Sequence, residues 1–114
     1  MLSENKKIVV DYMDRLWNQK DISVIDEVFA PQAQLRSPLG AFFSPEGMKE
    51  IVNTWLNRVP DISITQQHLV EDHDIVTSHW QANSSSIDYR GVTIHRLQNG
   101  KIVEYWAYTD RVEI

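Results

Sequence analysis

The sequence predicts an α+β fold in which helices come first and an antiparallel sheet follows. Before Pro60, apolar residues recur at the 3.6-residue spacing of helices. After Pro60, apolar and polar residues alternate, as they do in half-buried strands. Helices that precede a run of strands must cover one face of the resulting sheet. We therefore expect a curved antiparallel sheet wrapped around N-terminal helices.

Three helices are predicted before Pro60. The first has Ser3 as its N-cap. The second is capped by Asp21 and is stopped by Pro31, and the third begins at Ser44-Pro45-Glu46, with Ser44 as N-cap and Pro45 at the first helical position. Their apolar faces are, in turn, Ile8, Val9, Tyr12, Met13, Leu16 and Trp17; Ile22, Ile25, Val28 and Phe29; and Met48, Ile51, Val52, Trp55 and Leu56.

One short strand is predicted between the second and third helices, at 32–37. The segment 38–43 is then an unusually apolar loop, which we expect to fold over another part of the molecule. Turns are marked by Asp72-His73-Asp74 and by Asn99-Gly100. The remaining strands are predicted at about 62–71, 75–85, 89–97 and 102–109.

Composition places the chain among ordinary globular proteins. It has 114 residues, no cysteine, a formal net charge of −5 and 42% hydrophobic residues. A chain of this length buries roughly two-thirds of the surface that its unfolded form exposes, so one domain over 1–114 needs neither disulfides nor structural metal. The charge gives no basic footprint for nucleic acid or an anionic membrane. No apolar run approaches the ~20 residues of a membrane span, and we expect a cytoplasmic protein.

The order of the predicted elements resembles that of the SnoaL-like polyketide cyclases, which belong to the nuclear transport factor 2-like superfamily. Similar features are the break at Asn18-Gln19-Lys20-Asp21, the stretch Ser44-Pro45-Glu46-Gly47, and above all the segment RLQNGKIVEYW at 96–106. The resemblance runs nearly end to end. It implies a cone-shaped fold of the cystatin-like α+β barrel type, in which a strongly bent sheet wraps around three helices and an apolar pocket, usually in a homodimer.

The superfamily includes cyclases, ketosteroid isomerases, dehydratases, hydrolases and proteins that only bind or assemble, so the resemblance alone selects no reaction. SnoaL-like cyclases carry pocket acid/base residues on the last two strands, fourteen positions apart. The matching positions here are Thr93 and Ala107, neither of which can shuttle a proton. Tyr105 stands where the family's hairpin often has His, and a phenol does not normally titrate near neutral pH.

The register of the last hairpin decides which side chains face the pocket. A three-residue loop, 98–100, pairs Leu97 with Lys101, His95 with Val103, Thr93 with Tyr105 and Gly91 with Ala107. A two-residue Asn99-Gly100 turn would instead place His95 opposite Glu104. The comparison with the family favours the three-residue loop, which brings Thr93, His95, Tyr105 and Ala107 to one face.

His95 and Tyr105 are the candidate catalytic residues, although His95 could also be a hydrogen-bonded histidine in a half-buried strand. Gln66 and His68 continue the phase of Ile62 and Ile64, which predicts either a pocket mouth or simple exposure at the sheet end. His79 is expected on the outer face and His73 in solvent. The candidate substrate-binding residues are Tyr12, Trp17, Trp55, Gln66, His68, Trp80, Thr93 and Ala107.

No metal or cofactor is expected, because the histidines lack ligand spacing and there is no glycine-rich phosphate loop. The outer face of the last strands carries Ile94, Ile102, Trp106 and Tyr108, which favours a homodimer. Two functions remain open. One is a pocket protein for an apolar carbonyl or aromatic compound, with cofactor-independent cyclase or isomerase chemistry through His95. The other is a non-catalytic dimeric domain for ligand binding or assembly.

Overall fold

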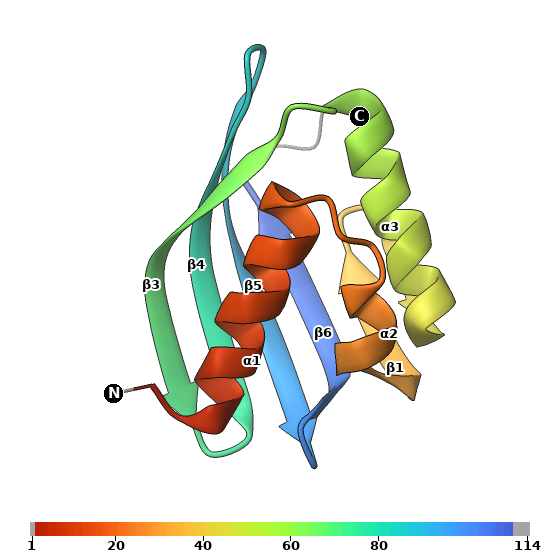
Figure 1. Ribbon diagram of the computed structural model, residues 1–114, viewed down its shortest axis with the longest axis vertical. Coiled ribbons are helices and arrows are strands. Elements are labelled where there is room, and N and C mark those ends of the chain that lie inside the picture. The colour runs from red at the N-terminus through yellow and green to blue at the C-terminus, as the bar shows by residue number, and fades with distance from the viewer. Residues whose placement is uncertain (1, 111–114) are drawn as a thin grey trace.

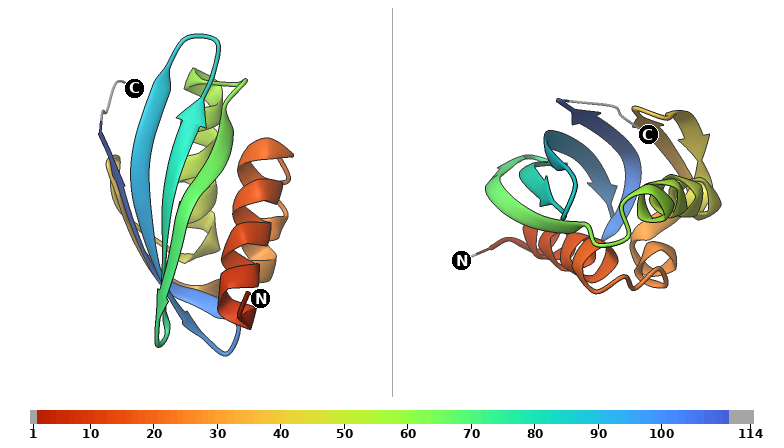
Figure 2. Two further views of the ribbon diagram at one scale, coloured as in Figure 1. Left: turned by 90° about the vertical axis from the view of Figure 1, so that its left-hand side faces the viewer. Right: turned by 90° about the horizontal axis from the view of Figure 1, so that it is seen from above.

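The computed structural model describes residues 2–110, in which three helices lie against one face of a six-stranded sheet (Figure 1). The sheet curls around the helices without closing, and this gives the cone its open shape (Figure 2). The helices are α1 (Glu4–Met13), α2 (Val24–Val28) and α3 (Ser44–Arg58). The strands are β1 (Phe29–Ser37), β2 (Gly40–Phe43), β3 (Ser63–Asp72), β4 (Ile75–Asn83), β5 (Asp88–Gln98) and β6 (Lys101–Thr109).

Helix α1 begins and ends with local hydrogen bonds that the sequence dictates. The Ser3 hydroxyl accepts from the backbone N–H of Lys6 at 3.1 Å, as predicted for an N-cap. At its other end the helix widens into one π-helical turn, Asp14–Asn18, where the N–H of Gln19 donates to the Asp14 carbonyl at 3.1 Å. Trp17 lies in this turn, and its side chain is buried in the core.

The boundaries of two helices differ from the prediction. Helix α2 begins at Val24, with Ser23 at the N-cap position instead of Asp21. Helix α2 ends at Val28 and the chain is already extended at Phe29, so β1 runs through Pro31 instead of starting after it. Pro31 lies where the β1–β6 register is irregular, between Phe29 and Gln34. Proline has no backbone N–H, and it is tolerated here because this part of β1 is not regularly paired with β6. Helix α3 has Pro45 in its first turn as expected, but Ser44 has a φ of 66° and makes no cap hydrogen bond.

The strand order is β2-β1-β6-β5-β4-β3, and every neighbouring pair is antiparallel except β1 and β6. The four strands expected after Pro60 form an antiparallel meander, as predicted. The parallel pairing of β1 with β6 was not predicted. The segment predicted as a loop at 38–43 is partly a strand as well, because β2 folds back on β1 and pairs with it antiparallel. Leu39 and Phe42 pack against the core, whereas Phe43 is exposed.

A β-bulge at Val103 sets the register of the last hairpin. Gln98 pairs with Lys101 across a two-residue turn, and beyond the bulge His95 lies opposite Tyr105. The preferred three-residue loop is therefore wrong, and so is the alternative pairing of His95 with Glu104. Thr93, His95, Tyr105 and Ala107 nevertheless share the buried face of the sheet, as predicted.

The convex face of the sheet is not covered by the helices (Figure 2). Ile94 lies opposite Trp106 on this face, and both are partly exposed; Tyr108 is exposed there as well. Ile102 was expected beside them but is fully buried in the core, because it precedes the Val103 bulge and so points to the opposite side. Within the described residues, none of the helices has both the length and the apolar character to cross a membrane.

Candidate functional site

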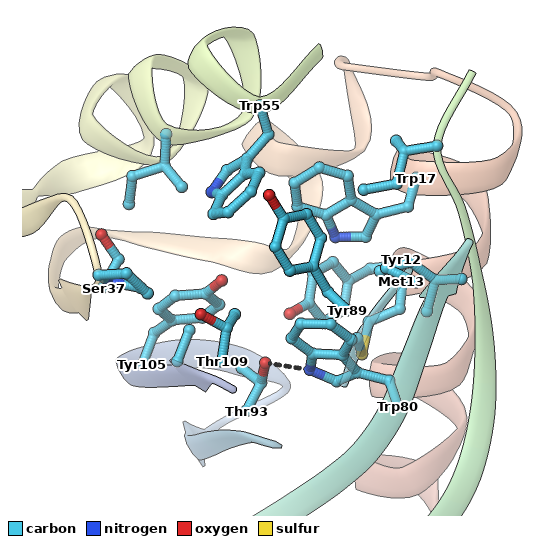
Figure 3. A pocket seen from close by; sticks show the side chains of 16 residues that line it. Tyr12, Met13, Trp17, Ser37, Trp55, Trp80, Tyr89, Thr93, Tyr105 and Thr109 are labelled. Carbon is cyan, nitrogen blue, oxygen red and sulfur yellow. Dashed lines mark hydrogen bonds between the residues drawn. The ribbon is translucent and has the colours of Figure 1, made fainter. Parts of the chain in front are cut away.

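The concave face of the sheet, together with α1 and α3, encloses an aromatic cavity near the open end of the cone (Figure 3). Trp17 reaches it from the π-helical turn, Trp55 from α3, Trp80 from β4 and Tyr89 from β5. The other lining residues are Tyr12, Met13, Ser37, Pro38, Ile51, Ile62, Ile64, Ala82, Thr93, Tyr105, Ala107 and Thr109.

Every described residue that lines the cavity is uncharged: none is Asp, Glu, Lys, Arg or His. The volume of the cavity is about 40 Å³, well below the ~300–1,000 Å³ of ordinary small-molecule sites. The aromatic rings fill most of the space between sheet and helices. A ligand larger than a few water-sized groups must therefore displace rings as it enters.

Tyr12 and His95 join helix α1 to the sheet at the cavity wall. The Tyr12 hydroxyl lies 2.5 Å from Nε2 of His95, and Nδ1 of His95 lies 3.0 Å from the Val76 backbone carbonyl. A carbonyl can only accept, so Nδ1 carries the imidazole proton and Nε2 accepts from Tyr12. Burial lowers the pKa of His95 to about 4 and raises the pKa of Tyr12 well above its usual value. Both groups are therefore neutral at pH 7.

A second hydrogen bond in the cavity wall links Trp80 to Thr93. The indole N–H of Trp80 donates to Oγ1 of Thr93 at 2.9 Å (Figure 3). Burial raises the pKa of the Tyr105 phenol, and the polar Thr93 hydroxyl opposes that rise in part. Thr93 and Ala107 lie directly opposite each other on β5 and β6. Neither supplies an acid or a base to the cavity.

Tyr89 brings a third phenol to the cavity. Its side chain is almost fully buried, and its ring packs edge-on against Trp55 with the ring centroids 5.4 Å apart. The hydroxyl points between Trp55 and Trp17 (Figure 3). It has no hydrogen-bond partner among the described residues. A buried hydroxyl without a partner is uncommon in native proteins and calls for an explanation.

Glycine at position 91 allows Trp80 to take its place in the cavity wall. Gly91 lies opposite Trp80 on the neighbouring strand. A Cβ atom at this position would lie 2.5 Å from the Trp80 ring and 2.4 Å from the Tyr108 carbonyl oxygen. The indole therefore packs flat over a position that has no side chain.

The model of the SnoaL-like domain matches residues 9–105. The chain belongs to the SnoaL-like domain family. This confirms the resemblance stated above. A search of curated proteins finds no match.

Solved structures share the fold of this SnoaL-like chain. A candidate polyketide cyclase from Acidithiobacillus ferrooxidans superposes with a TM-score of 0.86 at 23% identity, over 97% of this chain and 91% of that protein. IdmH, a candidate polyketide cyclase from Streptomyces antibioticus, gives 0.82 at 18% identity, over 95% and 93%. AclR, a candidate hydroxylase from Streptomyces galilaeus, gives 0.81 at 20% identity, over 96% and 91%. At these identities the comparison confirms the fold and leaves the reaction open.

Seven of the ten candidate site residues line the cavity of the SnoaL-like chain: Tyr12, Trp17, Trp55, Trp80, Thr93, Tyr105 and Ala107. His95 lies behind the lining, fully buried, and reaches the cavity only through Tyr12. Gln66 is half-buried beside α1, where its amide donates to Sδ of Met13 at 3.2 Å and accepts from Ser78. Gln66 is not part of the cavity wall.

His68 lies on the opposite face of the sheet from its predicted position. A bulge at Gln67 reverses the alternation of β3, so that Gln66 pairs with Trp80 and His68 pairs with His79. His68 is exposed, and its Nδ1 lies 3.0 Å from Nδ1 of His79. His79 is thus on the outer face, and His73 is exposed in its turn, as predicted. Within 2–110, no group of three or more His, Asp or Glu residues could hold a metal ion.

Tyr89 is the main site residue that the sequence analysis did not single out. It shares the strand phase of Gly91, Thr93 and His95, so alternation along β5 already placed it on the cavity side. Ser37 and Pro38 were also missed. They reach the cavity through the β1–β2 hairpin, and that hairpin was not predicted.

Proposed function

We propose that this SnoaL-like chain binds a small, uncharged and largely apolar molecule in the aromatic cavity, without acting as a proton-abstracting cyclase. The observation that carries the proposal is the lining, which combines aromatic rings and hydroxyls and has no charged side chain in the described residues. Sites for small molecules are typically apolar with a few polar groups that orient the ligand. A charged ligand would lose its hydration without gaining a counter-ion.

The absence of a suitable base supports binding over cyclisation. Removing a proton next to a carbonyl requires a group whose pKa lies near the working pH. Thr93 and Ala107, which match the acid/base positions of SnoaL-like cyclases, cannot supply one. The imidazole of His95 has a pKa of about 4 and already accepts a hydrogen bond from Tyr12.

Native mass spectrometry of the protein purified from cells tests this proposal. We expect a bound small molecule that is released on denaturation. In a variant with the cavity filled, Ala107→Phe, the added mass should disappear, whereas Ala41→Phe on the exposed strand β2 should retain it. Soaking the apo protein with a panel of neutral aromatic compounds provides a second route. Identical ligand occupancy in both variants would refute binding in this cavity.

A second function, acid/base isomerisation, is favoured by the 2.5 Å contact between Tyr12 and His95. In this reaction the Tyr12 oxygen would take a proton from the carbon next to the substrate carbonyl while the hydrogen of Tyr12 passes to Nε2 of His95. The reverse transfers would then return a proton at the new carbon position. The test is turnover of a ketone panel by the wild type and by His95→Gln. Loss of turnover together with retained ligand binding supports isomerisation. Unchanged turnover would exclude a role for His95.

We also propose that the convex face of the sheet forms a homodimer contact. Ile94 and Trp106 form a cross-strand pair there, with Tyr108 exposed beside them. Sedimentation equilibrium should give a dimer for the wild type and a monomer for Ile94→Lys/Trp106→Lys. A wild-type monomer at high micromolar concentration would rule the contact out.

A further inference from the structure

The buried hydroxyl of Tyr89 has no hydrogen-bond partner within the described part of the fold. The Tyr89 side chain is 2% exposed, and its oxygen is the one buried side-chain polar atom in 2–110 that is left unpaired. Buried hydroxyls in native proteins nearly always have a partner, because they lose their bonds to water on burial. Tyr89 lines the cavity, so a molecule inside the cavity can supply the partner that the fold does not.

Strand pairing and ring packing fix the position of the Tyr89 hydroxyl in the cavity wall. Tyr89 pairs with Ala82 on the neighbouring strand, and the small Ala82 side chain offers it no hydrogen bond. The Tyr89 ring meets the Trp55 ring edge-on, at 80° and with 5.4 Å between the ring centroids. The hydroxyl lies between the indole rings of Trp55 and Trp17 (Figure 3).

Two other polar groups of the cavity wall have already given their hydrogens to the fold. The Tyr12 hydroxyl donates to Nε2 of His95, and the Trp80 indole N–H donates to Oγ1 of Thr93. A ligand that accepted from either group would have to break one of these hydrogen bonds. The hydrogen of Tyr89 is available to a ligand without that loss.

The surroundings of Tyr89 favour an acceptor as its partner. An indole N–H can only donate, and of the three indoles that line the cavity, that of Trp80 alone donates to another described residue. The indoles of Trp17 and Trp55, on either side of the Tyr89 hydroxyl, therefore add no acceptor there. A phenol can act in both ways, but it donates more strongly than it accepts, because its ring draws electron density from the oxygen. An acceptor atom is what this part of the cavity lacks.

We propose that Tyr89 selects the ligand, by donating its hydroxyl hydrogen to a neutral carbonyl oxygen while the apolar part of the ligand packs against the indoles of Trp17 and Trp55. This inference rests on the proposed function, because it requires a neutral ligand in the cavity. A carboxylate does not fit as the acceptor, since no described lining residue carries a positive charge to replace its hydration. An apolar molecule of the same shape leaves the hydroxyl unpaired, and a site built to hydrogen-bond its ligand discriminates against such analogues.

Two probes of nearly the same shape test the inference by calorimetry. Acetophenone carries a carbonyl oxygen, and α-methylstyrene has a CH₂ group in its place. The probes differ in hydration, so the informative quantity is the change in each affinity on Tyr89→Phe, in which that difference cancels. We expect this substitution to weaken acetophenone between about twofold and tenfold, and to leave α-methylstyrene unchanged or bound more tightly.

Tyr108→Phe is the matched control, because it removes the same oxygen from an exposed side chain on the outer face. It should change neither affinity. A merely structural role for the Tyr89 hydroxyl would weaken both probes together and lower the melting temperature of the free protein. The proposed role leaves the melting temperature of the free protein unchanged or raised, since the lost oxygen has no partner there. Equal changes in the two affinities would overturn the inference.

The infrared carbonyl band of bound acetophenone provides a second readout. In the wild type it should lie at lower frequency than in hexane, because a donor meets the oxygen, and Tyr89→Phe should move it back toward the hexane value. The same band in both proteins would contradict donation by Tyr89, as expected if only a buried water meets this hydroxyl. That result, or equal changes in affinity, overturns this inference alone. Failure of both probes to bind the wild type overturns the proposed function as well.

Discussion

The Tyr12 hydroxyl donates to Nε2 of His95 at 2.5 Å, across 83 positions of sequence. The two rings also meet edge to face, with their centroids 5.4 Å apart. This contact ties the first helix to the concave face of the sheet, and it keeps the imidazole out of the cavity. His95 was a candidate catalyst on sequence grounds, and the structure gives it a buried position from which it acts on Tyr12.

The pH dependence of stability should report the buried, neutral state of His95. Burial lowers its pKa in the folded protein from 6.5 to about 4. Above pH 6.5 the imidazole is neutral in both states and contributes nothing. Between pH 6.5 and about 4, the His95 imidazole binds a proton in the unfolded chain but not in the folded protein. The free energy of unfolding therefore falls as pH falls. The total fall from this group is roughly 3 kcal/mol.

The reference for this measurement is His95→Gln, which removes the titration. Urea unfolding of both proteins from pH 8 to 4 separates the contribution of His95 from that of the carboxylates, which change alike in the two. The groups that face His95 are the phenols of Tyr12 and Tyr105, so no neighbouring charge among them masks the effect. Parallel pH curves for the two proteins would contradict a neutral buried imidazole. Nitrogen NMR of the imidazole provides a direct check.

Removing the Tyr89 hydroxyl should stabilise the free protein or leave it unchanged. Tyr89→Phe deletes a buried oxygen that has no partner among the described residues, and an unsatisfied buried polar group costs about 1–3 kcal/mol. Tyr12→Phe is the contrast, because it leaves Nε2 of His95 without its donor and should destabilise by about 1–3 kcal/mol. Thermal and urea unfolding measure both changes. Equal destabilisation by the two substitutions would show that Tyr89 has a partner.

Gly91→Ala should displace Trp80 from the cavity wall. The new methyl group would lie 2.5 Å from the indole and 2.4 Å from a backbone oxygen. Relieving the second clash requires the backbone of β6 to move, which costs more than rotating a side chain. We expect destabilisation of at least about 1–3 kcal/mol and a change in tryptophan fluorescence. Val92→Ala, on the next position and the other face, is the control for strand propensity. A variant with wild-type stability and fluorescence would be inconsistent with this packing.

Deleting Gln67 should be tolerated, because this residue is the extra one in the β3 bulge. Gln66 would still pair with Trp80 and His68 with His79, so every other side chain keeps its face. We expect a loss of less than about 2 kcal/mol. Deleting Thr77, in the regular strand β4, should prevent folding because half of that strand would reverse its faces. Urea unfolding distinguishes the two variants, because only the Gln67 deletion should give a cooperative transition. A similar loss of stability in both variants would argue against a bulge at Gln67.

Much of this fold follows from periodicity. The spacing of apolar residues places the faces of α1 and α3 correctly, and strict alternation places Thr93, His95, Tyr105 and Ala107 on the buried side. The placement of these four residues on the buried side is correct, although the hairpin register on which it relied is wrong. The actual pairing beyond Val103 differs from the expected one by two residues, and a shift of two leaves each side chain on its own face.

The bulges explain the errors in the site. Before Val103 the register differs by one residue, which is why Ile102 is in the core and not on the outer face. At Gln67 one extra residue moves His68 out of the cavity side in the same way. Neither Gln67 nor Val103 is a residue type that marks a bulge. Bulges accompany the curvature of the sheet, which depends on how the helices pack against it and is not encoded locally.

The parallel pairing of β1 with β6 has a consequence for how the protein is made. Leu35 is held against Tyr105, 70 positions later in the sequence, and none of the strands between them pairs with β1 at that place. During synthesis β1 and β2 therefore stay unpaired with the rest of the sheet until β6, which ends at Thr109, has left the ribosome. Contacts between such distant segments also slow folding. Nascent chains of this protein should depend on chaperones that shield the apolar side of β1 until β6 has emerged.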